Sequence, residues 1–153
     1  MQQEKTTVAE ASAQIYKNMK MGESGLLDLL PKVKDETLRG EIVGHMEGYQ
    51  RFADEAKTLL DAEHREAKDA GIIAKVSAKV GTAMNTMMDS TASHIAEMVI
   101  EGSTMGVTDS MRILHELERS DCSNDPNYEK ACRLSASIVS FEEKEIEKMK
   151  KYL

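Results

Sequence analysis

Apolar residues recur at alternating spacings of three and four positions along most of this sequence. That spacing is the period of an amphipathic helix with one face turned toward a core. Pro31 ends the first helical segment, Asp35 is a natural N-cap for the second, and Gly71 is a natural stop for it. Asp125 and Pro126 suit the N-cap and the first position of a last helix. The pattern predicts four long helices, over about residues 8–31, 36–69, 90–119 and 126–153.

The stretch from residue 72 to residue 120 is helical in pattern throughout. As a single helix it would be about 73 Å long at 1.5 Å per residue, whereas the other helices would be about 40–50 Å long. A break is therefore needed, and Asp89-Ser90-Thr91 offers the best N-cap. Residues 72–88 then form an amphipathic helical crossover between helices two and three. Because such a crossover travels the length of the bundle, it makes those two helices parallel and predicts an all-α four-helix bundle of ferritin-like topology.

The composition limits the class of protein. With 153 residues the chain is a single helical-bundle domain, 1–153, large enough to bury a core without disulfide bonds. A net charge of −7 argues against a nucleic-acid binder that relies on a basic surface. No apolar run approaches the roughly 18 residues that span a bilayer, and the N-terminus lacks the apolar region of a secretory signal. Cys122 and Cys132 have neither metal nor catalytic spacing, so we expect a cytoplasmic protein with two reduced thiols.

The helix layout and one segment resemble a known superfamily. The segment is Ile95-Ala-Glu-Met-Val-Ile-Glu-Gly-Ser-Thr-Met-Gly-Val107. Together they resemble small bacterial members of the ferritin-like four-helix-bundle superfamily that lack the usual di-iron Glu-x-x-His motifs. The resemblance implies a ferritin-like bundle. It does not by itself imply an activity, because the superfamily includes iron stores, oxidases and bundles without any metal.

The di-iron signature of that superfamily is absent from this sequence. Ferritin-like di-iron proteins take a Glu from each of two helices and a Glu-x-x-His pair from each of the other two. Here no Glu is followed by a His three residues later. The reversed pair His94 and Glu97 falls, with Glu101, on the face opposite the apolar one, and His115 lies in a charged stretch. We therefore expect these residues to face solvent.

A layer in the middle of the bundle is predicted to hold three polar residues and one glycine: Glu23, His45, Glu142 and Gly102. His45 lies within the apolar arc of helix two, Glu142 lies at the centre of that of helix four, and Glu145 and Glu23 lie at the edges of theirs. Counting residues from the turns places Glu23, His45 and Glu142 at one level. Glycine inside a helix is unfavourable by about 0.8–1.0 kcal/mol relative to alanine, so inward glycines indicate close backbone approach or room for a ligand. Three inward glycines lie at this depth: Gly22, Gly102 and Gly106.

Two interpretations of the layer remain open. In the first, Glu142 accepts a hydrogen bond from His45 and the layer fixes the register of the bundle. In the second, His45, Glu142, Glu145 and Glu23 form a metal site, for which carboxylates and one imidazole favour iron or manganese. The second His of the usual ligand set is missing, and helix three offers only Asp109 in its place.

Gly40, Gly44 and Gly48 form a line, one every four residues, on the face of helix two predicted to point away from the core. Lines of small residues let two helix backbones approach closely. They predict a homodimer contact, or docking of residues 72–88, along this face. The alternative is that these are tolerated surface glycines.

Three functions are consistent with these features. The first is a non-catalytic bundle acting as an oligomeric or partner-binding protein, because the sequence carries no nucleophile elbow, P-loop, HExxH motif or dinucleotide loop. The second is a degenerate ferritin-like protein that binds iron or manganese in the mid-bundle layer. The third is a carrier of a small ligand, in a pocket opened by the inward glycines. Neither a nucleic acid nor a membrane is an expected partner.

Overall fold

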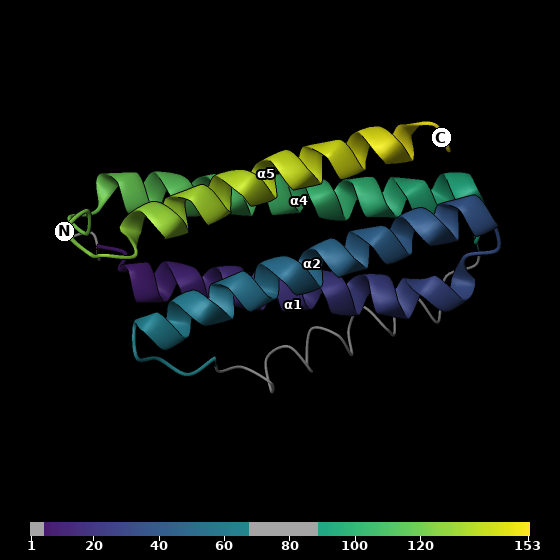
Figure 1. Ribbon diagram of the computed structural model, residues 1–153. Coiled ribbons are helices and arrows are strands. Elements are labelled where there is room, and N and C mark those ends of the chain that lie inside the picture. The colour runs from purple at the N-terminus through teal and green to yellow at the C-terminus, as the bar shows by residue number, and fades with distance from the viewer. Residues whose placement is uncertain (1–4, 68–88) are drawn as a thin grey trace.

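The computed structural model describes residues 5–67 and 89–153, which form a bundle of four long helices with no strand among them (Figure 1). The helices are α1 (Val8–Leu29), α2 (Glu36–Ala62), α4 (Ala92–Arg119) and α5 (Tyr128–Lys150), and a short 3-10 helix, η1 (Leu30–Lys32), follows α1. The predicted all-helical bundle is confirmed. The predicted crossover over residues 72–88 lies outside the described residues.

Side chains cap the first three of these long helices at their N-termini. Thr7 and Glu10 form a capping box, in which each side chain accepts a hydrogen bond from the backbone N–H of the other. Asp35 accepts from the N–H three residues further on at 2.9 Å, as predicted. Thr91 does the same for α4, accepting from His94 at 3.2 Å. The break predicted at residues 89–91 is therefore confirmed.

The predicted end of the second helix is wrong. Helix α2 stops at Ala62 and does not continue to residue 69, because His64 takes the left-handed backbone conformation, with φ of 58°. The His64 N–H then donates to the Asp61 carbonyl at 3.1 Å, and the Arg65 N–H donates to the Leu60 carbonyl at 2.9 Å. This is the hydrogen-bond pattern that usually ends a helix at a glycine. His64 therefore takes the place of the glycine stop predicted at residue 71.

The predicted start of the last helix is also wrong, by two residues. Helix α5 begins at Tyr128, and Pro126 precedes it. The Asp125 carboxylate accepts from the Asn127 N–H at 2.8 Å, and the Asp125 carbonyl accepts from the Tyr128 N–H at 3.0 Å. Asp125 therefore closes a turn before the helix, and the helix itself begins two residues later than predicted.

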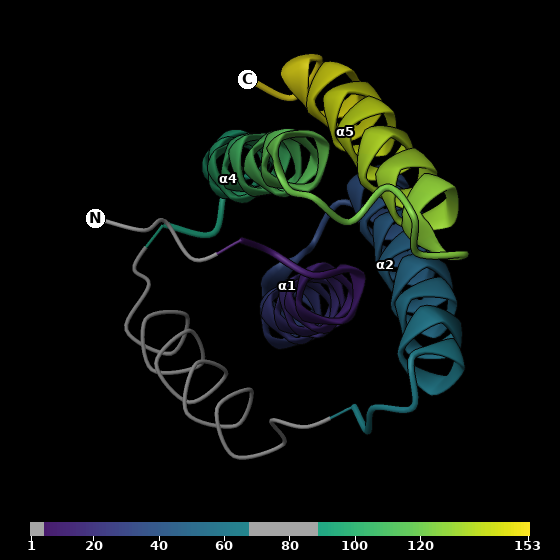
Figure 2. The ribbon, with the colours of Figure 1, turned by 90° about the vertical axis from the view of Figure 1, so that its left-hand side faces the viewer.

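The helices pack as two antiparallel pairs around one core. Helix α1 pairs with α2, and α4 pairs with α5. Viewed along the bundle, α2 lies beside α5 and α1 lies beside α4 (Figure 2). Helices α2 and α4 begin at the same end, so the last turn of α2 and the first turn of α4 lie at opposite ends of the bundle (Figure 1). None of the helices among the described residues carries an apolar stretch long enough to cross a bilayer.

The predicted apolar stripes form the core. Side chains from all four long helices are at most 2% exposed, among them Ile15, Ile42, Ile95 and Ile138. Burying one such side chain stabilises the fold by about 1.5–3 kcal/mol. Leu153, the last residue of the predicted fourth helix, is instead 64% exposed. The reason is that α5 ends at Lys150, three residues before it.

The glycine line on α2 does not lie on one outer face. Gly40 and Gly44 are exposed, and a Cβ atom on either would meet nothing within 4 Å. Gly48 is buried, and a Cβ atom there would overlap the ring of Phe141. At 3.6 residues per turn, each step of four rotates the position by about 40°. Two steps therefore carry the line from solvent into the core, and the prediction that Gly48 faces outward is wrong.

Candidate functional site

The predicted polar layer is built around His45 of α2, whose side chain is 1% exposed. Its Nε2 atom lies 3.5 Å from Oε2 of Glu142, and its Nδ1 atom lies 3.9 Å from Oε2 of Glu145. Both carboxylates come from α5, three residues apart and hence on one helix face. The prediction that these three side chains meet in the middle of the bundle is confirmed.

Aromatic rings hold the imidazole of His45 in place. The ring centroid of Tyr49 lies 4.5 Å from that of His45, and the centroid of Phe141 lies 5.4 Å away, edge to face. Phe141 fits against α2 because Gly48 leaves room for its ring. The buried glycine on α2 therefore serves to position the neighbours of His45.

The two carboxylates have different surroundings. Oε1 of Glu145 accepts a hydrogen bond from the exposed Lys148 ammonium at 2.9 Å. Neither oxygen of Glu142 has a hydrogen-bond partner among the described residues, and neither nitrogen of His45 has one. At 3.5 Å the two groups are beyond the usual 2.7–3.2 Å of a hydrogen bond. Leaving a buried polar group unpaired is unfavourable by about 1–3 kcal/mol, and more for a charge.

Glu142 lies at the floor of a cleft of about 370 Å³ between α1 and α4. The floor also includes His45, Tyr49 and Ser103. The Ser103 hydroxyl is buried and has no hydrogen-bond partner in the described part of the chain. The cleft walls are largely apolar and rich in methionine: Met19, Met21, Leu26, Met98, Val99 and Met105. Met105 is 67% exposed, so the cleft opens to solvent on that side.

Three glycines shape this cleft. A Cβ atom on Gly106 would lie 2.7 Å from Oε1 of Glu142, and one on Gly22 would lie 2.8 Å from the ring of Tyr49. A Cβ atom on Gly102 would meet nothing within 4 Å, because this residue is exposed and borders the open part of the cleft. Gly22 thus allows the ring of Tyr49 to lie close to α1, and Gly106 allows the carboxylate of Glu142 to lie close to α4. Gly102 leaves open space in the cleft. The predicted close approach is confirmed at Gly22 and Gly106. The prediction that Gly102 faces inward is wrong, because this residue is exposed.

The floor of the cleft perturbs the ionisation of Tyr49. Burial raises the pKa of the Tyr49 phenol well above its usual value, and so do the negative charge of Glu142 and the close approach of the phenol to that carboxylate, which does not reach hydrogen-bond geometry; Ser103 lowers it by a smaller amount. The phenol therefore keeps its proton at neutral pH. It adds a neutral hydroxyl to the polar groups at the floor.

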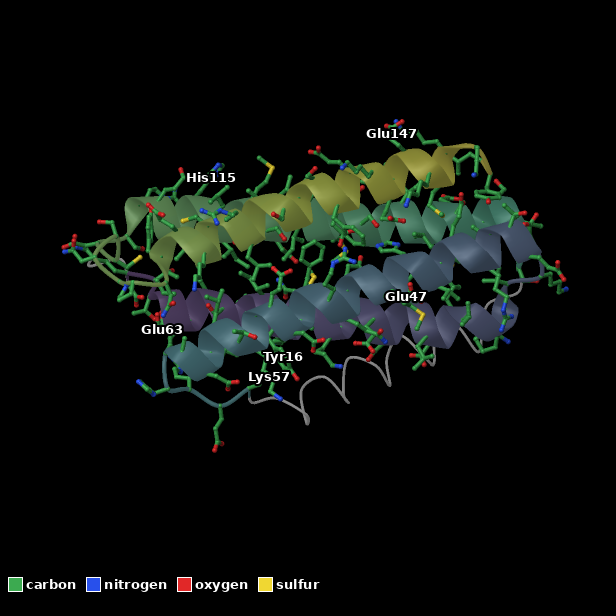
Figure 3. The ribbon with its side chains drawn as sticks, in the orientation of Figure 1. Tyr16, Glu47, Lys57, Glu63, His115 and Glu147 are labelled. Atoms are coloured by element: carbon green, nitrogen blue, oxygen red, sulfur yellow. The ribbon has the colours of Figure 1, made fainter. Side chains whose placement is uncertain are left out.

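The remaining predicted residues lie apart from this cluster. Glu23 of α1 pairs with Lys20 at 3.0 Å and accepts from the Gln50 amide at 3.0 Å. Asp109 borders the cleft and pairs with Arg112 at 3.5 Å. His115 on α4 and Glu147 on α5 are exposed, and Figure 3 shows both pointing away from the bundle. The expectation that His115 faces solvent is confirmed.

The geometry does not assemble the predicted metal ligand set. Glu142 faces Nε2 of His45 and Glu145 faces Nδ1, so the two carboxylates approach opposite edges of one imidazole. A metal ion takes an imidazole through one nitrogen. Within residues 5–67 and 89–153, no three His, Cys, Asp or Glu side chains lie close enough together to hold a metal ion. As they stand, these residues do not fit an iron or manganese centre.

The sequence alone did not predict that Ser103 and Tyr49 line a cleft. Tyr49 lies four residues after His45, on the same face of helix two, and no motif marks its hydroxyl as part of a site. Ser103 carries a readable signal, because it lies four residues after the buried Val99 and seven before the buried Ser110, which places it on the inner face of α4. No protein-family model, curated protein or solved structure matches this chain.

Proposed function

We propose that this protein is a non-catalytic helical bundle that binds a small molecule in the cleft between α1 and α4. The observation that carries the proposal is the Glu142 carboxylate, which is 1% exposed and unpaired among the described residues, yet lines an open cleft. A carboxylate in such a place is strongly disfavoured unless something supplies hydrogen bonds to it. A bound ligand does so.

The alternative of a purely structural polar layer fits less well. A layer that fixes register has its polar groups hydrogen-bonded to one another, since a partly satisfied layer is worse than an apolar one. Here His45, Glu142 and Ser103 all keep unpaired atoms in the described part of the chain. They lie beside a cleft whose volume falls within the roughly 300–1,000 Å³ typical of small-molecule sites.

The non-catalytic part of the proposal rests on the sequence and on the two thiols. The sequence carries none of the common motifs for a nucleophile, a phosphate loop or a zinc site. Cys122 and Cys132 are free, and burial raises the pKa of both thiols above its usual value. A protonated, partly buried thiol is a poor nucleophile. Two free thiols also suit the reducing cytoplasm, where we propose that the protein works.

We propose a ferritin-like topology for the bundle. Its support is that α2 and α4 begin at the same end of the bundle, so these two helices are parallel (Figure 1). We also propose that the protein forms a homo-oligomer through the exposed Gly40 and Gly44 face, without Gly48. This proposal is supported by the open space beside Gly40 and Gly44, which lets the backbone of a helix from a second copy approach α2 closely.

Binding of iron or manganese remains the alternative function, and metal content tests it. The protein is purified without chelator, reloaded anaerobically with Fe(II) and analysed by mass spectrometry. Our proposal predicts well below one metal ion per chain. Near-stoichiometric metal that is lost in both His45→Ala and Glu142→Ala would establish the alternative and reject the small-molecule proposal.

Methionine-methyl NMR tests the proposed function itself. A fragment library that contains cations, anions and neutral compounds is added to protein labelled at the methionine methyl groups. The proposal predicts shifts concentrated at Met19, Met21, Met98 and Met105, which line the cleft. Absence of cleft-specific shifts with every fragment would reject it.

Two variants of α4 provide a matched comparison for this screen. Gly102→Leu places a side chain in the open part of the cleft, whereas Thr108→Leu places the same side chain at an exposed position of the same helix that does not line the cleft. Gly102→Leu is expected to abolish the shifts and Thr108→Leu to preserve them. Equal binding by the two variants would mean that the fragments bind outside the cleft.

A further inference from the structure

We propose that the ligand of the cleft is an organic cation, a primary ammonium attached to an apolar body. This inference rests on the proposed function and adds the chemical class of the ligand. In the proposed complex the ammonium donates hydrogen bonds to the Glu142 carboxylate and the Ser103 hydroxyl. The apolar body lies against the methionine-rich walls.

The charges around the cleft favour a cation. Three carboxylates line it, those of Glu101, Asp109 and Glu142, and no Lys or Arg is among the described residues that line it. Arg112 offsets Asp109 at 3.5 Å but is not itself a lining residue. Glu142 has neither a Lys nor an Arg beside it, because Lys148 pairs with Glu145, and its basic neighbour is the His45 imidazole at 3.5 Å. An anionic ligand would be repelled by the floor of the cleft.

The hydrogen-bonding atoms at the floor suit an ammonium group. A primary ammonium has three donors and no acceptor. The unpaired oxygens at the floor are both oxygens of Glu142 and the oxygen of Ser103, and each of them can accept a hydrogen bond. The unpaired nitrogens of His45 lie at the floor as well, 3.5 and 3.9 Å from the carboxylates of Glu142 and Glu145. The three oxygens are the acceptors to which an ammonium group would donate.

The walls require that the cation be organic. An inorganic cation such as Mg²⁺ or Mn²⁺ needs several oxygen ligands or bound waters around it. The floor supplies one buried carboxylate that lacks a Lys or Arg partner, and the walls supply methionine, leucine and valine side chains. Methionine side chains are flexible and adapt to ligands of varied shape. The cleft therefore fits a molecule with one charged end and an apolar remainder.

Three ligands of equal length test this class. Binding of n-hexylammonium, 1-hexanol and hexanoate is measured by calorimetry and by methionine-methyl NMR. We expect n-hexylammonium to bind about ten- to hundredfold more tightly than 1-hexanol, because it adds a charge-assisted hydrogen bond at a buried site. Hexanoate is expected to bind more weakly than either.

Two glutamate variants locate the origin of the preference. In Glu142→Gln, n-hexylammonium is expected to bind no more tightly than 1-hexanol, while 1-hexanol still shifts the cleft methyl groups. Glu145→Gln is the matched control, since its carboxylate faces the other edge of His45 and pairs with Lys148. This variant is expected to keep the preference for the ammonium.

The outcomes separate the two proposals. If 1-hexanol or hexanoate binds the cleft at least as tightly as n-hexylammonium, the cation inference is rejected and the small-molecule proposal stands. If none of the three ligands binds and the fragment library also fails, the small-molecule proposal is rejected as well. Should Glu142→Gln fail to fold, the order of the three ligands on the unmodified protein still decides the inference.

Discussion

Nε2 of His45 lies 3.5 Å from Oε2 of Glu142, and neither atom has a hydrogen-bond partner in the part of the chain that the structure describes. Both side chains are almost completely buried. Most buried polar groups in folded proteins are hydrogen-bonded, so a pair left in this state points to a partner that the fold does not supply. The adjoining cleft provides the place for that partner.

Replacing Glu142 by methionine is expected to stabilise the free protein. The variant removes an uncompensated buried carboxylate and fills similar volume with an apolar side chain. We expect the free energy of unfolding to rise by about 1–3 kcal/mol, measured by urea denaturation without ligand. A loss of more than about 3 kcal/mol is the result that a strong structural His45–Glu142 ion pair would give. That result would contradict our interpretation.

Gly106→Ala is expected to weaken ligand binding without unfolding the protein. The new methyl group would lie 2.7 Å from Oε1 of Glu142 and so displaces the carboxylate from its position. The carboxylate lies at the end of a flexible side chain and can move, while alanine gains about 0.8–1.0 kcal/mol of helix propensity. Affinity for n-hexylammonium should fall at unchanged or higher thermal stability. Gly102→Ala is the control, because its methyl group meets nothing within 4 Å, and it should gain stability and keep affinity.

Gly48→Ala and Gly44→Ala are expected to have opposite effects on stability. At Gly48 the added methyl group overlaps the ring of Phe141, and overpacking of this kind is unfavourable by about 1–3 kcal/mol. At Gly44 it meets open space, and the gain in helix propensity is about 0.8–1.0 kcal/mol. Urea denaturation of the two variants checks the difference. Similar values for both would mean that Gly48 does not face the core.

Tyr49→Phe is expected to flatten the fall in stability at alkaline pH. The pKa of the folded Tyr49 phenol is raised, mainly by burial and then by Glu142, so the unfolded chain loses this proton first as the pH rises. The stability that the neutral phenol contributes is complete below the unfolded pKa of about 10, and it is lost as the pH rises above that value. Unfolding free energies at pH 9 and pH 11 should therefore differ less in Tyr49→Phe than in the unmodified protein. Equal pH dependence of the two proteins would show that Tyr49 is not buried as described.

The height of each residue along the bundle axis could be predicted from the sequence. The side of the helix from which its side chain points could be predicted only in part. Counting from the turns brought His45 and Glu142 together, because a helix rises by a fixed 1.5 Å per residue. The same counting placed Glu23 at that level, yet its side chain pairs with Lys20 and Gln50. Gly48 was misplaced for a similar reason, since a line of every fourth residue rotates toward the core. The side chain of a residue at the edge of an apolar arc can point either into the core or toward solvent. Which of the two it does depends on how the neighbouring helix packs against it.

The helix ends that were wrong depend on local backbone geometry. His64 ends α2 by taking a left-handed conformation, and nothing in the sequence marks it as clearly as a glycine would.

The cleft could not be predicted directly from the sequence either. The inward glycines indicated room at the right depth, but whether they leave a cavity or allow close packing depends on large neighbours such as Tyr49 and Phe141.

A crystal structure of the protein soaked with n-hexylammonium tests the central claim most directly. Our account predicts the ammonium nitrogen within about 2.7–3.2 Å of a Glu142 oxygen, with the alkyl chain between α1 and α4. The account is contradicted if the cleft stays empty or holds only water under saturating ligand. It is also contradicted if Glu142 is hydrogen-bonded within the protein itself.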